Sequence, residues 1–255
     1  MYEQLVEKIS MLGQSKVTMI RESRGKFFVL SMLAGIYVGF GILLIFSVGG
    51  MIGDSPYKKI LMGISFGIAL SLVLMVGSEL FTGNNMIMMI SSLDRRVKWI
   101  DTLKIWGYSF VGNLVGSIVI AWMYVESGSG KGSIARFFIT VSESKMTGDW
   151  GELFFKGILC NMLVCLAILS YMKLKEETAK LIMIFWCLFA FITSGFEHSV
   201  ANMTIMSVAL LLSESGLTTL GFLHNMIPVT LGNMVGGGIL MGMGYWFVGR
   251  KLPSH

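Results

Sequence analysis

GSELFTGN at residues 77–84 and GFEHSVAN at residues 195–202 share the pattern G-x-E-x-x-x-x-N and lie 118 positions apart. Each stretch puts a glutamate and an asparagine in the middle of a long apolar segment. Irregular backbone and charge are tolerated at that depth of a bilayer only where they line a cavity or pack inside protein. Corresponding interruptions in two halves of a membrane protein therefore indicate a pathway near the bilayer midplane.

The composition is that of a membrane protein. Of the 255 residues, 54% are hydrophobic and 14% are charged, and the mean hydropathy is +0.73. That is more apolar surface than one soluble core of this size can hide. Six segments are long and apolar enough to span a bilayer, and the second and fifth carry the interruptions. They are Phe27–Gly53, Ile60–Ile90, Ile105–Val125, Gly157–Met172 extended back to Leu153, Leu181–Leu212 and Met226–Gly249.

Six spans place both ends of the chain on one side of the membrane, and the Lys and Arg distribution selects the side. Fourteen of the 20 Lys and Arg residues fall in the terminal segments and in the loops on their side. We therefore predict a multi-pass protein of the cell (inner/cytoplasmic) membrane with cytoplasmic N- and C-termini. The pI of about 9.1 follows from this asymmetry, and no basic stripe is interleaved with aromatics, so the sequence predicts no nucleic-acid partner.

A second pair of repeated features divides the chain into halves. Gly112-Asn113 and Gly232-Asn233 open corresponding spans 120 positions apart, close to the offset of the interruptions. We therefore expect an all-α integral membrane protein of two three-helix repeats, about residues 26–125 and 150–250. An odd number of spans in each repeat makes the repeats inverted.

The six-helix transmembrane domain expected at residues 26–250 has a short segment at each end. Leu5, Val6, Ile9 and Leu12 recur at helical spacing, so residues 1–25 are predicted to form a cytoplasmic amphipathic segment. This segment is either an interfacial anchor or a movable plug for the pathway. Residues 251–255 are expected to form a cytoplasmic tail.

The polar residues of the interruptions have two uses. Glu79, Asn84, Glu197 and Asn202 are expected mainly to support the broken helices, whose freed backbone groups need partners that lipid does not provide. His198 is expected to be functional, because an imidazole titrates near neutral pH and both donates and accepts hydrogen bonds.

Enzyme and metal chemistry find little support in the motifs. The three histidines, His198, His224 and His255, form no cluster and no H-E-x-x-H motif. No Gly-rich phosphate loop or G-x-S-x-G nucleophile turn is present. The sequence therefore predicts no catalytic residue, no metal and no cofactor.

Several motifs together resemble the formate/nitrite transporter family. They are GSELFT at 77–82, GNLVGS at 112–117, KGILCNMLVCLA at 156–167, GFEHSVANM at 195–203 and LGNMVGGG at 231–238. The resemblance covers about residues 25–250 in the family's order. The short chain and compact N-terminal segment are also similar to the family's hydrosulfide channels.

The resemblance implies an aquaporin-like six-helix protomer with helices 2 and 5 broken, assembled in the bilayer as a homopentamer with one pore in each protomer. It places the pore histidine at His198 and its facing threonine at Thr82. It also places the fourth-helix asparagine at Asn161 and the vestibule lysine at Lys145, with Lys156 as a competitor. The narrowing residues fall on Phe66, Leu70, Leu80, Phe81 and Phe191.

These residues suggest how a small monovalent anion (hydrosulfide, formate or nitrite) crosses an apolar constriction despite the cost of desolvation. Lys145 would concentrate the anion, Thr82 and Asn161 would supply hydrogen bonds, and His198 would donate a proton so that the neutral acid crosses. A plain anion channel, with His198 only a hydrogen-bond donor, is the nearest alternative mechanism. An aquaporin-like channel for small neutral solutes is the alternative function.

Overall fold

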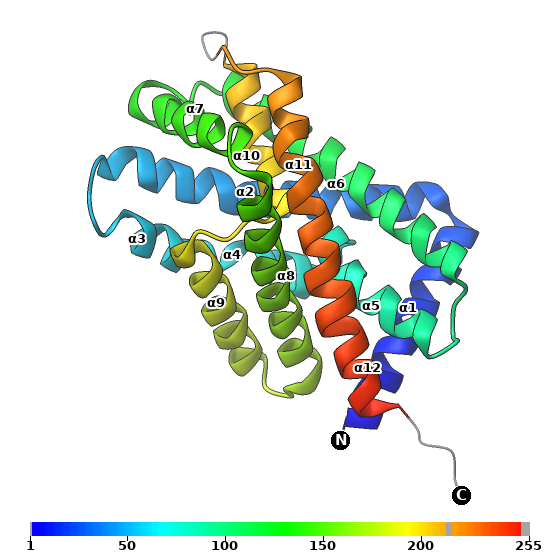
Figure 1. Cartoon of the computed structure of the whole chain (residues 1–255). Helices are drawn as coiled ribbons and strands as arrows, with labels where there is room; N and C mark the ends of the chain where they lie inside the picture. Colours follow the sequence, from blue (N-terminus) through cyan, green and yellow to red (C-terminus); the bar gives the residue numbers. More distant parts are fainter. Residues whose placement is uncertain (1, 213–215, 251–255) are drawn as a thin grey trace, which may run out of the picture.

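A computed structural model describes residues 2–212 and 216–250, and all regular structure in these ranges is helical (Figure 1). The helices are α1 (Tyr2–Glu22), α2 (Arg24–Ile52), α3 (Lys58–Ser65), α4 (Ile68–Leu72), η1 (Val73–Gly77), α5 (Phe81–Leu93), α6 (Trp99–Glu126), α7 (Gly132–Met146), α8 (Trp150–Lys173), α9 (Glu177–Ser194), α10 (Ser199–Leu211), α11 (Thr219–Met234), η2 (Val235–Met243) and α12 (Gly244–Gly249). The segments η1 and η2 are π-helical. The predicted tail at 251–255, with His255, lies outside the described residues.

Six helical segments in the described ranges are long and apolar enough to cross a membrane, as predicted. The second is Lys58–Gly77, formed by α3, α4 and η1, and the sixth is Thr219–Gly249, formed by α11, η2 and α12. The shorter helices α5 and α10 each follow one of the two interruptions. The chain is therefore an all-α, multi-pass membrane protein.

Both interruptions break the helix at a glycine with positive φ. Gly77 has φ 93° and Gly195 has φ 74°, a region that side-chain-bearing residues rarely adopt. The chain then runs extended through Leu80 before α5 and through His198 before α10. The predicted breaks are confirmed, and each delivers a new helix N-terminus into the protein interior.

One asparagine in each half ties the break to two neighbouring helices. Asn113 on α6 accepts a hydrogen bond from the Phe81 amide at 2.9 Å and donates to the carbonyls of Ser31 and Glu79. Asn233 on α11 repeats these three bonds in the second half. Its partners are the amide of Ser199 and the carbonyls of Gly157 and Glu197. The matching pattern confirms that the halves are structural repeats.

Glycines allow the first and third spans of each half to touch through their backbones. A Cβ added to Gly116 would lie 2.0 Å from the carbonyl oxygen of Met32, and one added to Gly236 would lie 2.3 Å from that of Ile158. Such close approach allows van der Waals packing to hold the helices together. This packing matters because no hydrophobic driving force acts between helices in lipid.

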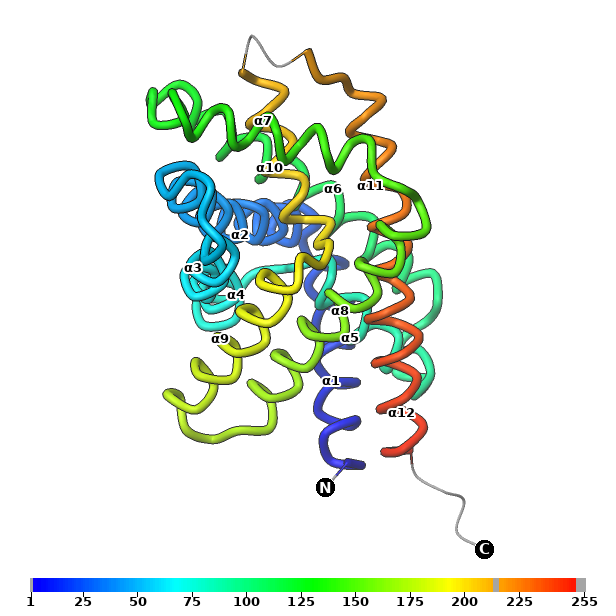
Figure 2. The backbone as a smooth tube through the Cα atoms, turned by 60° about the vertical axis from the view of Figure 1, so that its left-hand side comes forward, coloured from blue at the N-terminus to red at the C-terminus, as the bar shows by residue number. Residues whose placement is uncertain are grey.

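The predicted amphipathic segment is helix α1, but its apolar face is covered by protein. Val6, Ile9, Val17 and Ile20 are buried. The helix packs on α5, α2 and α12, and it lies beside α12 in both ribbon views (Figures 1 and 2). Protein therefore covers this face of α1, and the anchor and plug interpretations of the segment stay predictions.

Helix α7 was not predicted. It packs on α2, α10 and α11 in the connection between the two halves. Ile134, Phe137, Phe138 and Val141 recur along it at helical spacing, so a signal for an amphipathic helix was present in the sequence.

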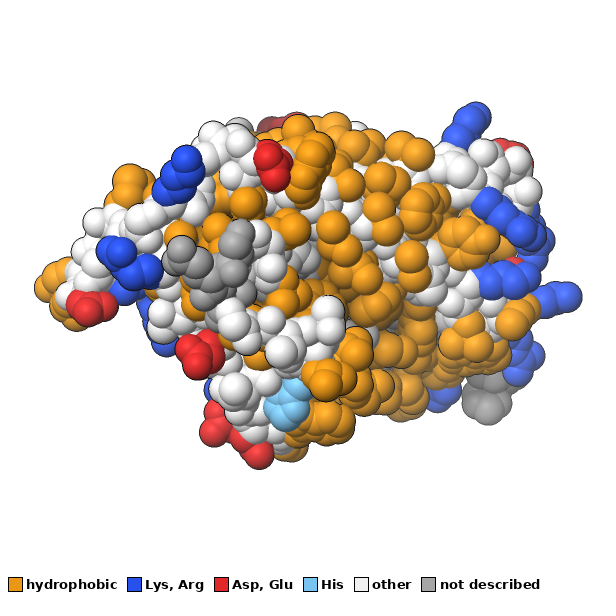
Figure 3. All heavy atoms as spheres, turned by 90° about the horizontal axis from the view of Figure 1, so that it is seen from above, with side chains coloured by type: hydrophobic (Ala, Val, Ile, Leu, Met, Phe, Trp, Pro, Cys, Tyr) orange, Lys and Arg blue, Asp and Glu red, His pale blue; other side chains and the backbone are white. Residues whose placement is uncertain are grey.

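The surface separates apolar from charged side chains. A broad apolar belt lies between two charged ends in the space-filling view, and Lys and Arg dominate one of these ends (Figure 3). This is the pattern expected of a protein with its middle in hydrocarbon and its ends in water.

Candidate functional site

His198 ends the second break and caps helix α10. Its Nδ1 accepts a hydrogen bond from the Ala201 amide at 3.1 Å, and its Nε2 lies 3.0 Å from Oγ1 of Thr82 on α5. A backbone N–H can only donate, so Nδ1 must be the unprotonated nitrogen. The neutral ring therefore carries its proton on Nε2, and this N–H group donates a hydrogen bond to Oγ1 of Thr82. The structure thus brings together the two residues predicted to face each other.

This arrangement has a consequence for the charge of His198. A second proton can only go to Nδ1, and there it would displace the Ala201 amide. Formation of the imidazolium therefore breaks the hydrogen bond by which the His198 side chain caps α10.

A small apolar cavity adjoins the imidazole. Four of the five predicted narrowing residues, Phe66, Leu70, Leu80 and Phe191, line it with His198, and its free volume of about 10 Å³ is at the lower limit for one water. The Phe66 and Phe191 rings meet edge to face at 5.4 Å, and Phe191 stacks on His198 at 6.0 Å. This part of the molecule is a dry constriction.

Phe81, the fifth predicted narrowing residue, does not line this cavity. Its buried ring meets the ring of Phe110 on α6 edge to face at 5.1 Å. The side chain therefore packs between α5 and α6.

A larger cavity of about 390 Å³ opens on the other side of His198. Its lining includes Lys58, Lys59 and Lys145 together with Glu197, so cationic groups outnumber anionic ones at the approach to the ring. His198 and Phe191 belong to the walls of both cavities and separate this vestibule from the constriction.

Lys145 rather than Lys156 is the lysine of this vestibule. Its Nζ lies 2.7 Å from Oε1 of Glu197, next to His198 in the chain. Lys156 instead pairs with Glu152 one turn earlier on α8, where its side chain is 42% exposed. Geometry thus separates two residues that sequence spacing left in competition.

Each break contains the same three-residue ion-pair network. Asn202 donates to Glu197 at 2.6 Å, and Asn84 donates to Glu79 at 3.0 Å. As Lys145 pairs with Glu197, so Lys16 of α1 pairs with Glu79 at 2.6 Å. The Glu and Asn side chains thus bond each other and a lysine, whereas Asn113 and Asn233 bond backbone groups at the breaks, so the supporting role of Glu79, Asn84, Glu197 and Asn202 stays a prediction.

Lys16 was missed by sequence reasoning. It follows Ile9 by seven residues, on the same face of α1, and is 7% exposed. A lysine on the buried face of an amphipathic helix was the available signal, but nothing in the chain order linked it to Glu79.

Asn161 and Thr82 line neither cavity. The Asn161 amide nitrogen donates inside the protein, to the carbonyls of Thr82 at 3.2 Å and Asn233 at 2.7 Å and to Oδ1 of Asn85 at 3.2 Å. In this structure Asn161 therefore hydrogen-bonds residues of both halves. Thr82 is connected to the cavities by its contact with His198.

Metal ligands do not gather in this site. Over residues 2–212 and 216–250, no three His, Cys, Asp or Glu side chains lie close enough together to hold a metal ion. Cys160, Cys165 and Cys187 are buried as free thiols in the spans.

Comparison with known proteins agrees with this architecture. The family model described as "Formate/nitrite transporter" matches residues 3–247. The chain belongs to the formate/nitrite transporter family. The nitrite transporter NirC of Escherichia coli (strain K12) is 44% identical to it over 232 residues, which cover 88% of this chain and 84% of NirC.

Two solved structures show the same fold for this family member. An "FNT family ion channel" matches with a TM-score of 0.90 and 39% identity, over 96% of this chain and 98% of that one. A "Pentameric formate channel with formate bound" matches with a TM-score of 0.80 and 30% identity, over 91% and 99%. The predicted family and aquaporin-like fold are confirmed, and these relatives are transporters and channels rather than enzymes.

Proposed function

We propose that this protein is a membrane channel for small monovalent anions of weak acids, assembled as a homopentamer with one pathway in each protomer. The pentameric formate channel and the nitrite transporter among its relatives support the substrate class, and the former supports the assembly. Nitrite is the first substrate to test, because identity to NirC is 44% whereas identity to the formate channel is 30%. Hydrosulfide stays a prediction.

One observation carries the proposal: the His198 imidazole, hydrogen-bonded to Thr82, belongs to the walls of both a vestibule lined by three lysines and one glutamate and a narrow apolar constriction. Cationic side chains attract an anion to the vestibule, but its charge is costly to move past the rings. A small anion reaching His198 would find the Nε2–H group, which at rest donates a hydrogen bond to the Thr82 oxygen. The position of this N–H group fits the last polar contact before the constriction.

We infer that His198 exchanges a proton with the substrate there, so that a neutral acid crosses. The geometry adds a condition to this step. The imidazolium, with its second proton on Nδ1, forms only when the Ala201 amide leaves that nitrogen. Proton transfer from Nε2 to the anion is therefore coupled to the cap of α10. Asn161 acts by holding the Thr82 carbonyl.

The test is competition in proteoliposomes that contain the purified full chain. Nitrite, formate and hydrosulfide are supplied in turn against one labelled anion, while internal pH is recorded. We expect uptake of the labelled anion, competition by all three, and the strongest competition from nitrite. Osmotic swelling with glycerol or urea, without anion uptake, would instead establish a channel for neutral solutes.

A further inference from the structure

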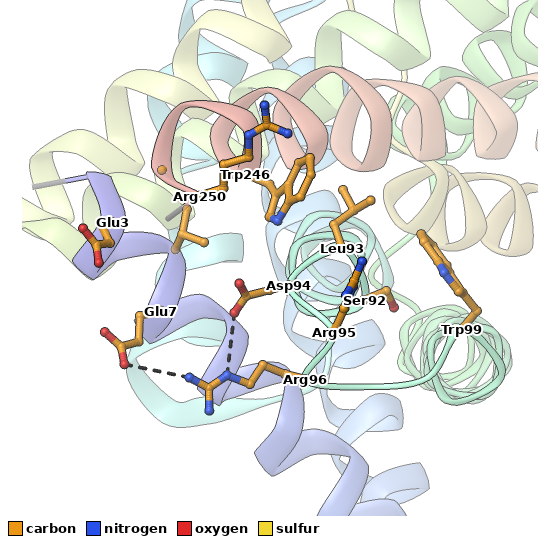
Figure 4. A pocket seen from close by; sticks show the side chains of 12 residues that line it. Glu3, Glu7, Ser92, Leu93, Asp94, Arg95, Arg96, Trp99, Trp246 and Arg250 are labelled. Atoms are coloured by element: carbon orange, nitrogen blue, oxygen red, sulfur yellow. Dashed lines mark ion pairs between the residues drawn. The ribbon is translucent and has the colours of Figure 1, made fainter. Parts of the chain in front are cut away.

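A third cavity, of about 650 Å³, lies between α1, the connection from α5 to α6, and α12. We call it the α1–α12 pocket, and its lining includes Glu7, Asp94, Arg95, Trp99, Trp246 and Arg250 (Figure 4). None of the residues assigned above to the anion pathway lines it. A function for this pocket must therefore be sought separately.

Positive and negative groups alternate along the pocket, with the Arg96 guanidinium between Glu7 and Asp94 (Figure 4). The carboxylates of Glu3 and Glu7 project from α1, whereas Arg95 lies beyond Asp94 on the other side (Figure 4). Arg96 lies 3.9 Å from Glu7 and 3.7 Å from Asp94, longer than hydrogen bonds, so both acids keep acceptor capacity. Among the described residues, no carboxylate lies within 4.0 Å of the Arg95 or Arg250 guanidinium.

The backbone at Arg95 is unusual. It has φ 59°, the one positive φ among the described residues other than glycine. The Arg95 and Arg96 amides donate to the carbonyls of Ser92 and Ser91, which closes α5 with the turn whose left-handed position glycine normally fills. Glycine would make this turn with less strain, so the arginine is explained by its side chain rather than by the turn.

The rim of the pocket continues into exposed apolar surface. Trp99, Leu103, Phe247 and Val248 are exposed apolar side chains on α6 and α12. Arg250 lies over the rings of Trp246 and Phe247, at 5.3 and 4.6 Å from their centroids. Tryptophan and arginine together are typical of the level where hydrocarbon meets the headgroups.

We propose that the α1–α12 pocket binds a phospholipid whose zwitterionic headgroup carries a phosphate and a primary ammonium, as in phosphatidylethanolamine. In this arrangement the Arg95 and Arg250 guanidinium groups bind the phosphate, and the Glu7 carboxylate on α1 faces the ammonium. The acyl chains lie over Phe247 and Val248. Guanidinium groups suit phosphate because they offer several fixed donors. Three arginines and three acids line the pocket, and this balance fits a zwitterion better than an anion.

The test uses the purified full-length pentamer, stripped of lipid in mild detergent. It is titrated with phosphatidylethanolamine, phosphatidylcholine or phosphatidylglycerol of matched chains, and bound lipid is counted by native mass spectrometry. We expect phosphatidylethanolamine to bind about tenfold more tightly than either of the others, the scale of one charge-assisted contact. Equal binding of phosphatidylethanolamine and phosphatidylcholine, or preference for phosphatidylglycerol, would overturn the proposal.

Arg95→Gly separates binding from folding, because it removes the guanidinium and relaxes the turn. We expect the variant to unfold at the wild-type temperature or above and to lose the preferred binding about tenfold. Arg250→Gln should lose it as well. Lys104→Gln is the matched control, since it removes a positive charge from an exposed residue outside the pocket. Unchanged binding in both arginine variants would contradict the site.

Discussion

Because the Ala201 amide donates to Nδ1 of His198, only Nε2 is available to the Thr82 hydroxyl and to a passing substrate. His198→Asn separates these two uses of the ring. Asparagine is a preferred N-cap whose side-chain oxygen accepts from the same amide, so α10 should keep its start. The substitution removes the imidazole, the group proposed to exchange a proton with the substrate.

We expect the His198→Asn pentamer to fold and to lose proton-coupled uptake of the weak acid by about 10²-fold, the lower end of what positioned proton transfer contributes. Uptake rate, pH dependence and proton stoichiometry are measured in proteoliposomes. Thr82→Val is the companion variant, since it removes the hydroxyl at nearly constant volume and should slow flux with either mechanism. If His198→Asn matches the wild type in all three measurements, His198 is no proton donor.

Individual site residues could be predicted where the residue type itself was unusual for its surroundings. His198 and Glu197 are polar groups in an apolar segment, and Thr82 was placed by the family's motif. Contacts between residues that lie far apart in the sequence could not be predicted. Lys16 meets Glu79 across 63 positions, and the amide of Asn161 turned out to bond inside the protein, because chain folding decides both contacts.

At the scale of helices, the breaks were predictable because glycine and charge interrupt hydrophobic runs. The hydrogen bonds that satisfy the backbone groups freed at these breaks could not be predicted. Asn113 and Asn233 each satisfy three backbone groups from two other segments, although sequence showed only that the Gly-Asn pairs repeat. Helix α7 was not predicted for another reason. Its sequence has an apolar face, but the segment as a whole is too polar to be counted as a membrane span.

Helix α6 offers a direct test of the close contact between spans. Gly116→Ala would put a methyl group 2.0 Å from the Met32 carbonyl oxygen, and backbone cannot move aside as a flexible side chain does. We expect a cost of about 1–3 kcal/mol from overpacking. It would be seen as a lower unfolding temperature and less pentamer on size exclusion.

Gly107→Ala on the same helix is the control. Apart from its chain neighbours and the backbone of α6 itself, no atom lies within 4 Å of the added Cβ, so this variant should be neutral or more stable by up to about 1 kcal/mol. Equal behaviour of the two variants would show that the α2–α6 contact does not limit stability.

For the whole molecule, charge distribution supports an orientation. The apolar belt separates two charged ends, and the end dominated by Lys and Arg is expected to face the cytoplasm (Figure 3). The lysines of the vestibule are proposed to serve the pathway rather than the topology. Local function and global orientation therefore use positive charge for different reasons.

Orientation is testable with one new cysteine, because the three native thiols are buried, with Cys160 and Cys165 at 0% and Cys187 at 7% exposure. Ser129 is exposed in the connection between α6 and α7. We expect an impermeant maleimide to label Ser129→Cys in intact cells, and a reporter fused after His255 to be active in the cytoplasm. The cysteine-bearing wild type supplies the background. Labelling of Ser129→Cys only after permeabilisation would mean that the Lys and Arg asymmetry selects the opposite side.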